Sequence, residues 1–486
     1  MYTREDLARL VIPNTTETEQ DTIRDLFHTW QTKLAKNQQR TLYYDGEQAF
    51  KDLGLMLPPQ LKNAKFILGW ATMAVRKAAI RSQFKGLRLP GSNDPLELAE
   101  VFETNDFALE FAQATVSAYK HGCAFVTVTS LQDGPGPVEM RSHSAETATA
   151  LWDGRRRRPT AALTITKQDQ DANPTEFRVY LDHIILHCEK TPTGWTTTRY
   201  RNDIGQTPVV PVTYDPQLSQ PFGRSRISNP VMSLTDMAVR AYVRMEGNAE
   251  FYSSPQIAIE NISPDQLASG DASAQAKFRL AMDRLIGLTK DADGDVPQVK
   301  QLQQATMAPH NDMIRTVAMA FTGETGIPPA SLGIIHDNPS SAEAIRAAEH
   351  DLLIDVTYQN DMVLSGAVKR IARLAVMVRD GLAAPPAEAS QLSAQFVDPE
   401  FRSVTANADA ALKLAALPQL SGSNVVLDGL LSEDQIGRVL ADQRRATASA
   451  VLDRLNTQAQ QPESEQRAMD PQLPDLPMPD PSQVEG

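Results

Sequence analysis

Residues 306–361 read TMAPHNDMIRTVAMAFTGETGIPPASLGIIHDNPSSAEAIRAAEHDLLIDVTYQND, a pattern that predicts two helices joined by a short irregular segment. In the first helix, Ile314, Val317 and Phe321 recur at the spacing of one helix face. Gly326 follows at the end of this pattern, where glycine commonly terminates a helix. The stretch therefore begins with an amphipathic helix that has a defined end.

Two prolines and a capping box mark where the helices end and begin in the rest of this stretch. The pair Pro328-Pro329 cannot continue a helix, because proline lacks an N–H and disfavours helix in the residue before it. Ser340 and Glu343 form a capping box, in which each side chain satisfies a backbone donor of the other residue. An apolar stripe follows the box, so a second helix begins there. Between the helices, residues 332–339 turn from apolar to polar.

Composition indicates a globular protein of more than one domain. The 486 residues exceed what one ordinary hydrophobic core organises. The hydrophobic fraction of 41% suffices for packing, and the low aromatic fraction of 6% favours helices. The net charge of −13 argues against a protein that coats nucleic acid, since such binding needs a basic surface. It remains compatible with a conduit through which DNA slides.

The cysteines and the N-terminus bear on the compartment. Cys123 and Cys188 are the two cysteines, and they show no metal-binding spacing. A disulfide between them is possible, but a reduced, cytosolic protein is the better interpretation. The first residues carry acids and lack the apolar core of a signal peptide, and no apolar run is long enough to span a membrane.

The N-terminal part is predicted to be a block of helices followed by strands. The first helix is amphipathic, and the break Tyr43-Tyr44-Asp45-Gly46 ends it. A second begins at Pro58-Pro59 and includes Phe66, Ile67 and Trp70. From Cys123 the pattern changes to short β-rich runs, which predict an antiparallel sheet inside a mainly helical, α+β protein. The expected helices are residues 16–39, 58–75, 96–103 and 107–119, and the expected strands are 123–130, 147–152, 161–167, 176–181, 183–188 and 195–200.

Four arginines, residues 155–158, stand between two of these strands. The run is short and contains no aromatic residue, so a solvated hairpin tip is a better interpretation than a nucleic-acid patch.

A long helix is predicted over residues 229–252. Asn229 is suited to the N-cap and Pro230 to the first helical position. The helix would be roughly 35 Å long at 1.5 Å per residue. Its charged residues are spread around the axis, so it is not simply a core helix; they are Arg240, Arg244, Glu246 and Glu250.

Further elements follow in order. Strands are expected at residues 255–261 and 285–290. The helix after Ser340 is expected to continue to Asp380 with a bend near Gly366, and a strand follows at 395–397. A capping box at Ser432 opens the final helix. The tail from Gln461 is rich in proline and acids and is predicted to be disordered.

No catalytic, cofactor-binding or metal-binding constellation is apparent. Asp291, Asp293 and Asp295 resemble the start of a calcium loop, but Gly294 is misplaced and no glutamate closes the loop. His121 near Cys123 is better explained as a packed histidine than as a catalytic dyad. These observations favour a structural or interaction protein. Two alternatives remain, a nucleic-acid-processing enzyme whose carboxylates assemble only in the fold, and a monomeric adaptor.

Several motifs carry a resemblance to one family. The segment GIPPASLG at residues 326–333, followed by SSAEAI at 340–345, resembles the tailed-phage portal proteins of the siphophage type found in phages of actinobacteria. Tyr43-Tyr44-Asp45-Gly46, Leu57-Pro58-Pro59 and Pro221-Phe-Gly-Arg-Ser225 are similar to that family at matching positions. The resemblance covers roughly residues 21–455, and its specificity lies in the order of the motifs.

The resemblance implies a ring of twelve subunits at one capsid vertex, in the virion and, during assembly, in the host cytoplasm. Double-stranded DNA enters through its channel during packaging and later leaves by it. The implied partners are the terminase large subunit, the major capsid protein, scaffold and a head-completion or adaptor protein. No cofactor and no membrane is implied.

The resemblance also implies a portal-protein fold with wing, stem, clip and crown regions. The tunnel loop facing DNA would comprise Ile334, Ile335, His336, Asp337, Asn338 and Ser340, and the stem would carry Arg240, Arg244, Glu246 and Glu250. This loop departs from a DNA-gripping segment because it contains neither lysine nor arginine. The implied regions are the wing at 1–228, a stem helix at 229–252, the clip at 253–308, a second stem helix at 309–328, the tunnel loop at 329–341, a return to the wing at 342–429, the crown at 430–460 and the disordered tail at 461–486.

Overall fold

The computed structural model describes residues 10–48, 66–92, 94–130, 136–252, 257–260, 298–301, 306–334, 342–400, 409, 413, 416 and 433–459. The chain divides into two compact units, Met1–Pro399 and Glu400–Gly486. In the second unit, helix α14 (Glu433–Ala459) begins directly after Ser432, as its capping signal predicts. The predicted disordered tail, most of the predicted loop and the acidic turn at Asp291 lie outside the described residues. All further elements belong to the first unit.

Helix α2 (Glu17–Asp45) opens this unit with a capping box. The Thr16 hydroxyl accepts a hydrogen bond from the Glu19 N–H at 3.3 Å, and the Glu19 carboxylate accepts one from the Thr16 N–H at 2.8 Å. The helix runs past the end predicted at residue 39 and stops at Gly46, whose φ is 73°. The prediction was wrong because Tyr43 is buried, so the apolar face continues to the last turn.

The next helices follow the sequence pattern with one shift. Helix α3 (Trp70–Ala79) starts later than predicted, and Phe66 and Ile67 precede it. An isolated turn, η2 (Pro95–Glu97), leads to α4 (Ala99–Thr104) and α5 (Phe107–His121), which agree with the two predicted helices.

Two antiparallel sheets follow. One contains three strands in the order β3 (Glu139–Ser144), β2 (Cys123–Thr129), β9 (Val209–Thr213). The other is a five-stranded meander of β4 (Ala148–Asp153), β5 (Arg158–Gln168), β6 (Pro174–Leu181), β7 (Ile184–Thr191) and β8 (Gly194–Arg201). The turn between β4 and β5 exposes Arg155, Arg156 and Arg157, as expected of a hairpin tip.

Strands β3 and β9 were not predicted. Strand β3 has a single fully buried residue, Met140, and so lacks a clear alternating pattern. Strand β9 contains Pro211, which argues against a central strand; it is tolerated because β9 lies at the edge of its sheet.

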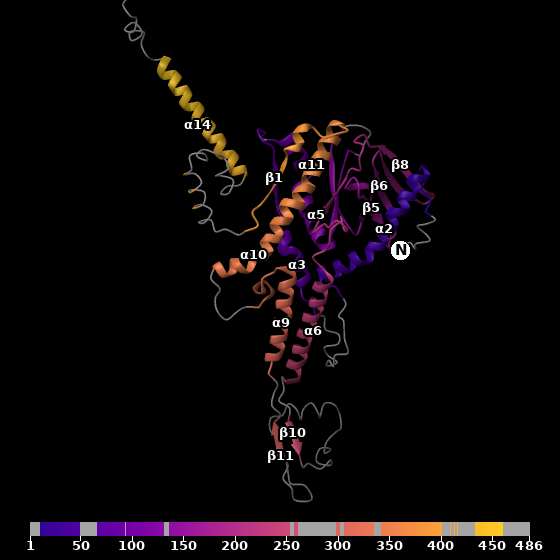
Figure 1. Cartoon of the computed structure of the whole chain (residues 1–486), viewed down its shortest axis with the longest axis vertical. Coiled ribbons are helices and arrows are strands. Elements are labelled where there is room, and N and C mark those ends of the chain that lie inside the picture. The colour runs from indigo at the N-terminus through magenta and orange to yellow at the C-terminus, as the bar shows by residue number, and fades with distance from the viewer. Residues whose placement is uncertain are drawn as a thin grey trace, which may run out of the picture. The chain divides into compact units, whose positions relative to one another are not determined.

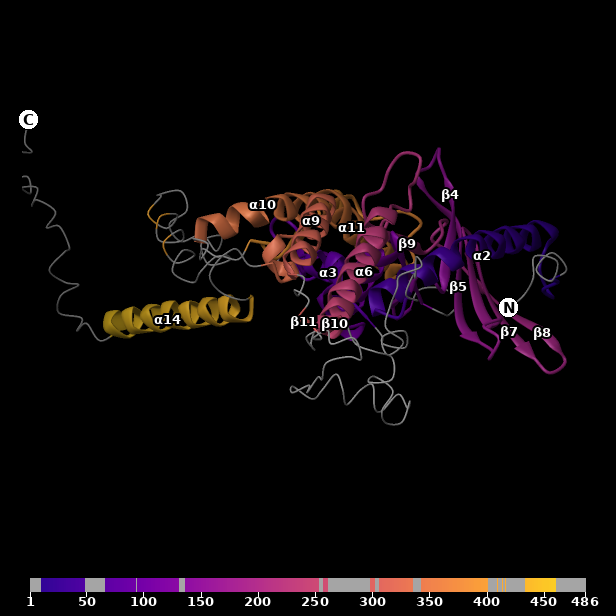
Figure 2. The ribbon, with the colours of Figure 1, turned by 90° about the horizontal axis from the view of Figure 1, so that it is seen from below.

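Helices cover the sheets. Buried residues of α2 pack on β5, β6 and β7, as Figure 2 also shows for α2 and β5. The aromatic pair Phe27 and Phe177 stands at the centre of this contact, with ring centroids 5.0 Å apart. The three-stranded sheet packs instead on α5 and α11 (Ser365–Asp380), which form the largest core.

Two long helices extend from the sheets and the helices that cover them, a part of the chain that we call the body. Helix α6 (Asn229–Tyr252) has the predicted bounds, and α9 (Ala308–Thr325) runs back beside it (Figure 1). Between them in sequence, β10 (Ile257–Glu260) pairs with β11 (Gln298–Gln301). Strand β10 agrees with its prediction; β11 was not predicted, and residues 285–290 lie outside the described part.

The chain returns through one long helical run. A short turn, η3 (Pro329–Leu332), follows α9, and α10 (Ala342–Tyr358) continues through a π-helical segment, η4 (Gln359–Leu364), into α11. The irregularity thus lies before the bend predicted at Gly366. After a turn, η5 (Ala387–Ser390), the chain ends this unit in β12 (Ser393–Phe396), which pairs with the unpredicted strand β1 (Phe84–Arg88).

A buried amide explains the π-helical segment. The side chain of Gln359 is 2% exposed and donates a hydrogen bond to the Thr213 carbonyl oxygen at 2.6 Å. It also accepts one from the Asp215 N–H at 3.3 Å. The widened turn therefore points a polar side chain at the end of β9, a tertiary demand that helix periodicity does not reveal.

Replacing Gln359 with methionine is expected to lower the free energy of unfolding by about 1–3 kcal/mol, because the buried Thr213 carbonyl loses its donor. Thermal or urea unfolding of the full chain measures the change. Gln39→Met, at an exposed position of α2, is the matched control and should be near neutral. Equal stability of the two variants would contradict the role given to Gln359.

Candidate functional site

The paired helices α6 and α9 are the most distinctive functional feature of the described residues. They lie side by side in both views (Figures 1 and 2). Near the body, Ala238 of α6 and Phe321 of α9 share a buried cluster with Trp70 of α3. The rings of Trp70 and Phe321 are 5.1 Å apart between centroids. This cluster holds the pair against the helical block.

The four charged residues predicted for the first long helix lie on α6. Arg240 and Arg244 are half-buried, and Glu246 is exposed; the side chain of Glu250 lies outside the described residues. One guanidinium nitrogen of Arg244 lies 3.9 Å from the sulfur of Met313 on α9. The two helices thus meet through polar as well as apolar side chains.

Of the six tunnel-loop residues predicted to face DNA, the structure describes only Ile334. Ile334 is half-buried and packs against the cluster that contains Phe321. Its N–H donates to the Pro329 carbonyl at 3.2 Å. The other residues predicted to face DNA lie outside the described part: Ile335, His336, Asp337, Asn338 and Ser340. Their role stays a prediction.

A buried arginine fastens the helix pair to the body. The side chain of Arg226, just before α6, is 4% exposed. Its Nε donates to the Ala74 carbonyl of α3 at 2.7 Å, and Nη2 donates to the Thr325 carbonyl at the end of α9 at 2.7 Å. Its Nη1 donates to the Tyr214 hydroxyl at 3.0 Å and to the Asp355 carboxylate of α10. One side chain therefore ties together four segments that are distant in sequence.

The electrostatics keep this guanidinium charged. Burial acts to lower the pKa of Arg226, but Tyr214 and Asp355 act in the opposite direction, and the pKa lies above its usual value. Burial raises the pKa of Tyr214 to about 12, so its hydroxyl stays protonated at neutral pH. The site is a structural ion pair with satisfied hydrogen bonds, since every nitrogen of the guanidinium has an acceptor.

Close backbone packing positions Arg226. Gly223 has a φ of +75°, and a Cβ there would stand 2.2 Å from the Tyr214 carbonyl oxygen and 2.6 Å from that of Gly122. A side chain cannot be accommodated at this position. The segment from Gly223 to Arg226 therefore lies flat against the end of α5, and the Arg226 N–H donates to the Tyr119 carbonyl at 2.9 Å.

Comparison of the sequence with known proteins identifies the family of this chain. A model of the phage portal protein family described as SPP1 Gp6-like matches residues 23–422. The chain belongs to this family of phage portal proteins. The resemblance inferred from the motifs is thereby confirmed.

Two relatives are portal proteins of mycobacterial phages. The portal protein of Mycobacterium phage D29 is 28% identical over 389 residues, which cover 77% of this chain and 78% of that protein. The portal protein of Mycobacterium phage L5 is 28% identical over 397 residues, which cover 78% of each chain.

Two solved structures are also similar. One is a chain from the neck of a native gene transfer agent particle, computed with C12 symmetry, with a TM-score of 0.42 and 13% identity over 80% of this chain and 98% of that chain. The other is from the virion of a native gene transfer agent particle, with a TM-score of 0.38 and 14% identity over 75% of this chain and 90% of that chain.

Membership decides between the function classes left open by the sequence. Portal proteins are structural components of the virion and not enzymes, so the interpretation as a structural protein is confirmed. Within the described ranges no group of His, Cys, Asp and Glu residues could hold a metal ion. No described helix is long and apolar enough to cross a membrane. Cys123 and Cys188 are free thiols, and His121 is buried at the end of α5.

Sequence reasoning missed the residues that fasten the portal's helix pair. The quoted motif Pro221-Phe-Gly-Arg-Ser225 stops one residue before Arg226. A second arginine directly before a capped helix, flanked by the apolar Ile227, was the available signal. Nothing in the sequence links it to Asp355, which lies in a different helix.

Replacing Arg226 with methionine is expected to lower the free energy of unfolding by about 3–5 kcal/mol, because the carboxylate and the carbonyls that it binds lose their donor. Differential scanning calorimetry of the full chain measures the loss.

Arg224→Met is the matched control two residues away. Arg224 is exposed and binds Asp215 at 3.0 Å, so its loss should cost less than about 1 kcal/mol. If Arg226→Met is no more destabilising than Arg224→Met, Arg226 does not fasten the helix pair.

Proposed function

We propose that this portal protein assembles as a ring of twelve copies at one vertex of the capsid. The ring is the conduit for genome packaging by the terminase and for later genome ejection. Family membership over residues 23–422 is the observation that carries the proposal. The chain assembles in the host cytoplasm and then becomes part of the virion.

Each region takes a role in this ring. Helices α6 and α9 are the stem, and the segment with β10 and β11 between them is the clip. The clip docks the terminase large subunit and, after packaging, a head-completion or adaptor protein. Residues 1–228 and 342–429 form the wing, which faces the major capsid protein and scaffold, and residues 430–460 form the crown.

The contacts of the stem with the body support these roles. A stem must transmit load between the clip and the wing without bending at its base. Arg226 links the start of α6, the end of α9 and two helices of the body through hydrogen bonds to buried carbonyls and a carboxylate. A closed ring repeats one head-to-tail interface. A rigid subunit is therefore needed to keep the angle between successive copies constant.

The mass of the purified full chain in solution tests the ring. Native mass spectrometry, with and without the scaffold and capsid proteins, should show an assembly of twelve copies. A chain that remains monomeric at high concentration under all of these conditions would contradict the proposal.

The tunnel loop is proposed to let DNA slide. Asp337 and Asn338 would present negative and polar groups to the channel, and a loop without basic residues does not hold phosphates. Replacing Asp337 with arginine creates a basic collar in the ring. DNA retention should then rise and become salt-dependent, because bound phosphates release counterions.

A packaging assay followed by release of DNA at several salt concentrations measures this effect, and Asn338→Gln serves as the uncharged control. Ring mass should be unchanged in both variants. Normal packaging and release by the Asp337→Arg particle would place the loop away from DNA.

A further inference from the structure

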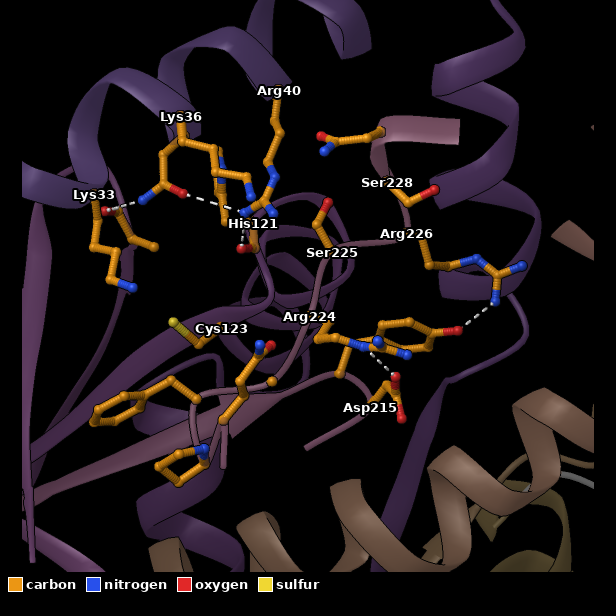
Figure 3. A pocket seen from close by; sticks show the side chains of 18 of the residues that line it. Lys33, Lys36, Arg40, His121, Cys123, Asp215, Arg224, Ser225, Arg226 and Ser228 are labelled. Atoms are coloured by element: carbon orange, nitrogen blue, oxygen red, sulfur yellow. Dashed lines mark hydrogen bonds and ion pairs between the residues drawn. The ribbon is translucent and has the colours of Figure 1, made fainter. Parts of the chain in front are cut away.

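A large cavity lies between helix α2 and the base of the stem. Its volume is about 1070 Å³, far more than a single ion or water occupies. Figure 3 shows α2 on one side, with Lys33, Lys36 and Arg40, and the segment containing Arg224, Ser225 and Arg226 on the other. We call this space the α2 cavity. No role assigned above to the stem, the clip or the tunnel loop uses it.

One wall of the α2 cavity is basic. Lys33, Lys36 and Arg40 occupy the same face of α2, since they are three and seven residues apart. Among the described residues, none of the three makes an ion pair. Their charges act on one another: Arg40, then partial burial, then Lys33 lower the pKa of Lys36. A wall of like charges, none of them in an ion pair within the described residues, favours an acidic occupant.

The deep end of this wall has polar atoms without partners. Arg40 donates through Nη1 to the His121 carbonyl at 2.6 Å, but its Nε has no hydrogen-bond partner in the described part of the chain. The imidazole of His121 is buried, and neither of its ring nitrogens has one there. The nearest carboxylate oxygen, of Glu146, is 3.9 Å from Nε2. Buried polar groups are normally satisfied, so these nitrogens offer hydrogen bonds to an occupant of the cavity.

The opposite wall carries acids. Arg224 and Arg226 on this side are paired with Asp215 and Asp355. The remaining acids that line the cavity are Glu324 and Asp351, and both residues are exposed. A polyanion such as DNA would therefore be attracted by one wall and repelled by the other. A polypeptide segment can present an acidic side chain to α2 and neutral or basic groups to the acidic wall. The charge pattern thus favours a protein occupant over nucleic acid.

We propose that the α2 cavity receives a polypeptide segment of the adjacent copy of this chain, with an acidic side chain against Lys33 and Lys36. The inference rests on the proposed ring. In a ring, each copy offers two different surfaces to its neighbours, and a cavity on one surface meets the same segment of the next copy at every interface. The chain has 60 acidic residues against 47 basic ones, so an adjacent copy has acidic segments to supply.

The double variant Lys33→Glu/Lys36→Glu tests this assignment. Both residues are exposed, so the variant should fold as the wild type does, which circular dichroism and thermal unfolding check. Reversing the charge of this wall should reduce the fraction of the chain found in rings in native mass spectra by roughly tenfold or more, because two acidic groups then face each other. Arg155→Glu/Arg157→Glu, on the exposed β4–β5 turn, changes the net charge equally and should assemble as the wild type does.

A second measurement identifies the occupant. A photo-crosslinking amino acid in place of Lys36, in the assembled full chain, should give covalent dimers of this chain that map to one acidic segment. If the wild type forms rings and Lys33→Glu/Lys36→Glu assembles equally well, the cavity proposal is wrong and the proposed ring is unaffected. Crosslinks to DNA or scaffold in place of a second copy would overturn it too. If the wild type forms no ring, the proposed function itself fails.

Discussion

The buried guanidinium of Arg226 is the constraint on which the rest of the structure depends. A charge removed from water is costly unless it is paired and its donors are satisfied. Here the acceptors come from α3, α9, α10 and the residue after β9, so they satisfy the arginine only when all four segments are in place. The stability of this contact is therefore cooperative, and it couples the position of α6 and α9 to the packing of the rest of the unit.

The same requirement explains why backbone segments pack closely against one another around Arg226. Gly223 lies against the carbonyls of Tyr214 and Gly122, and Gly326 ends α9 where a Cβ would approach the backbone of Leu352 to 3.4 Å. Ser228 adds a hydrogen bond to Glu324 of α9 at 3.0 Å. The start of α6 and the end of α9 are thus fixed by short-range contacts.

Helix periodicity and capping signals predicted α6, α9 and the order of the six β-rich runs, because those features are local. The strands that failed prediction lack local signals: β9 is interrupted by Pro211, and β1 and β3 are short and mostly half-buried. The π-helical segment directs Gln359 to donate a hydrogen bond to the carbonyl of Thr213, a residue distant in sequence. Arg226 was missed for the same reason, since its partners are close only in the folded chain. The family, by contrast, followed from the order of several short motifs.

Apolar side chains stay exposed on the pair of helices α6 and α9. Two helices bury a single seam between them, and here that seam contains Ala238, Val317 and Phe321. Met237 of α6 and Met319 of α9 stay 36% and 53% exposed, and Arg244 contacts the sulfur of Met313. Methionine adapts to irregular apolar surfaces, so these side chains suit a contact that repeats around a ring. In the proposed ring, α6 and α9 would gain from neighbouring copies the burial that this pair of helices cannot supply by itself.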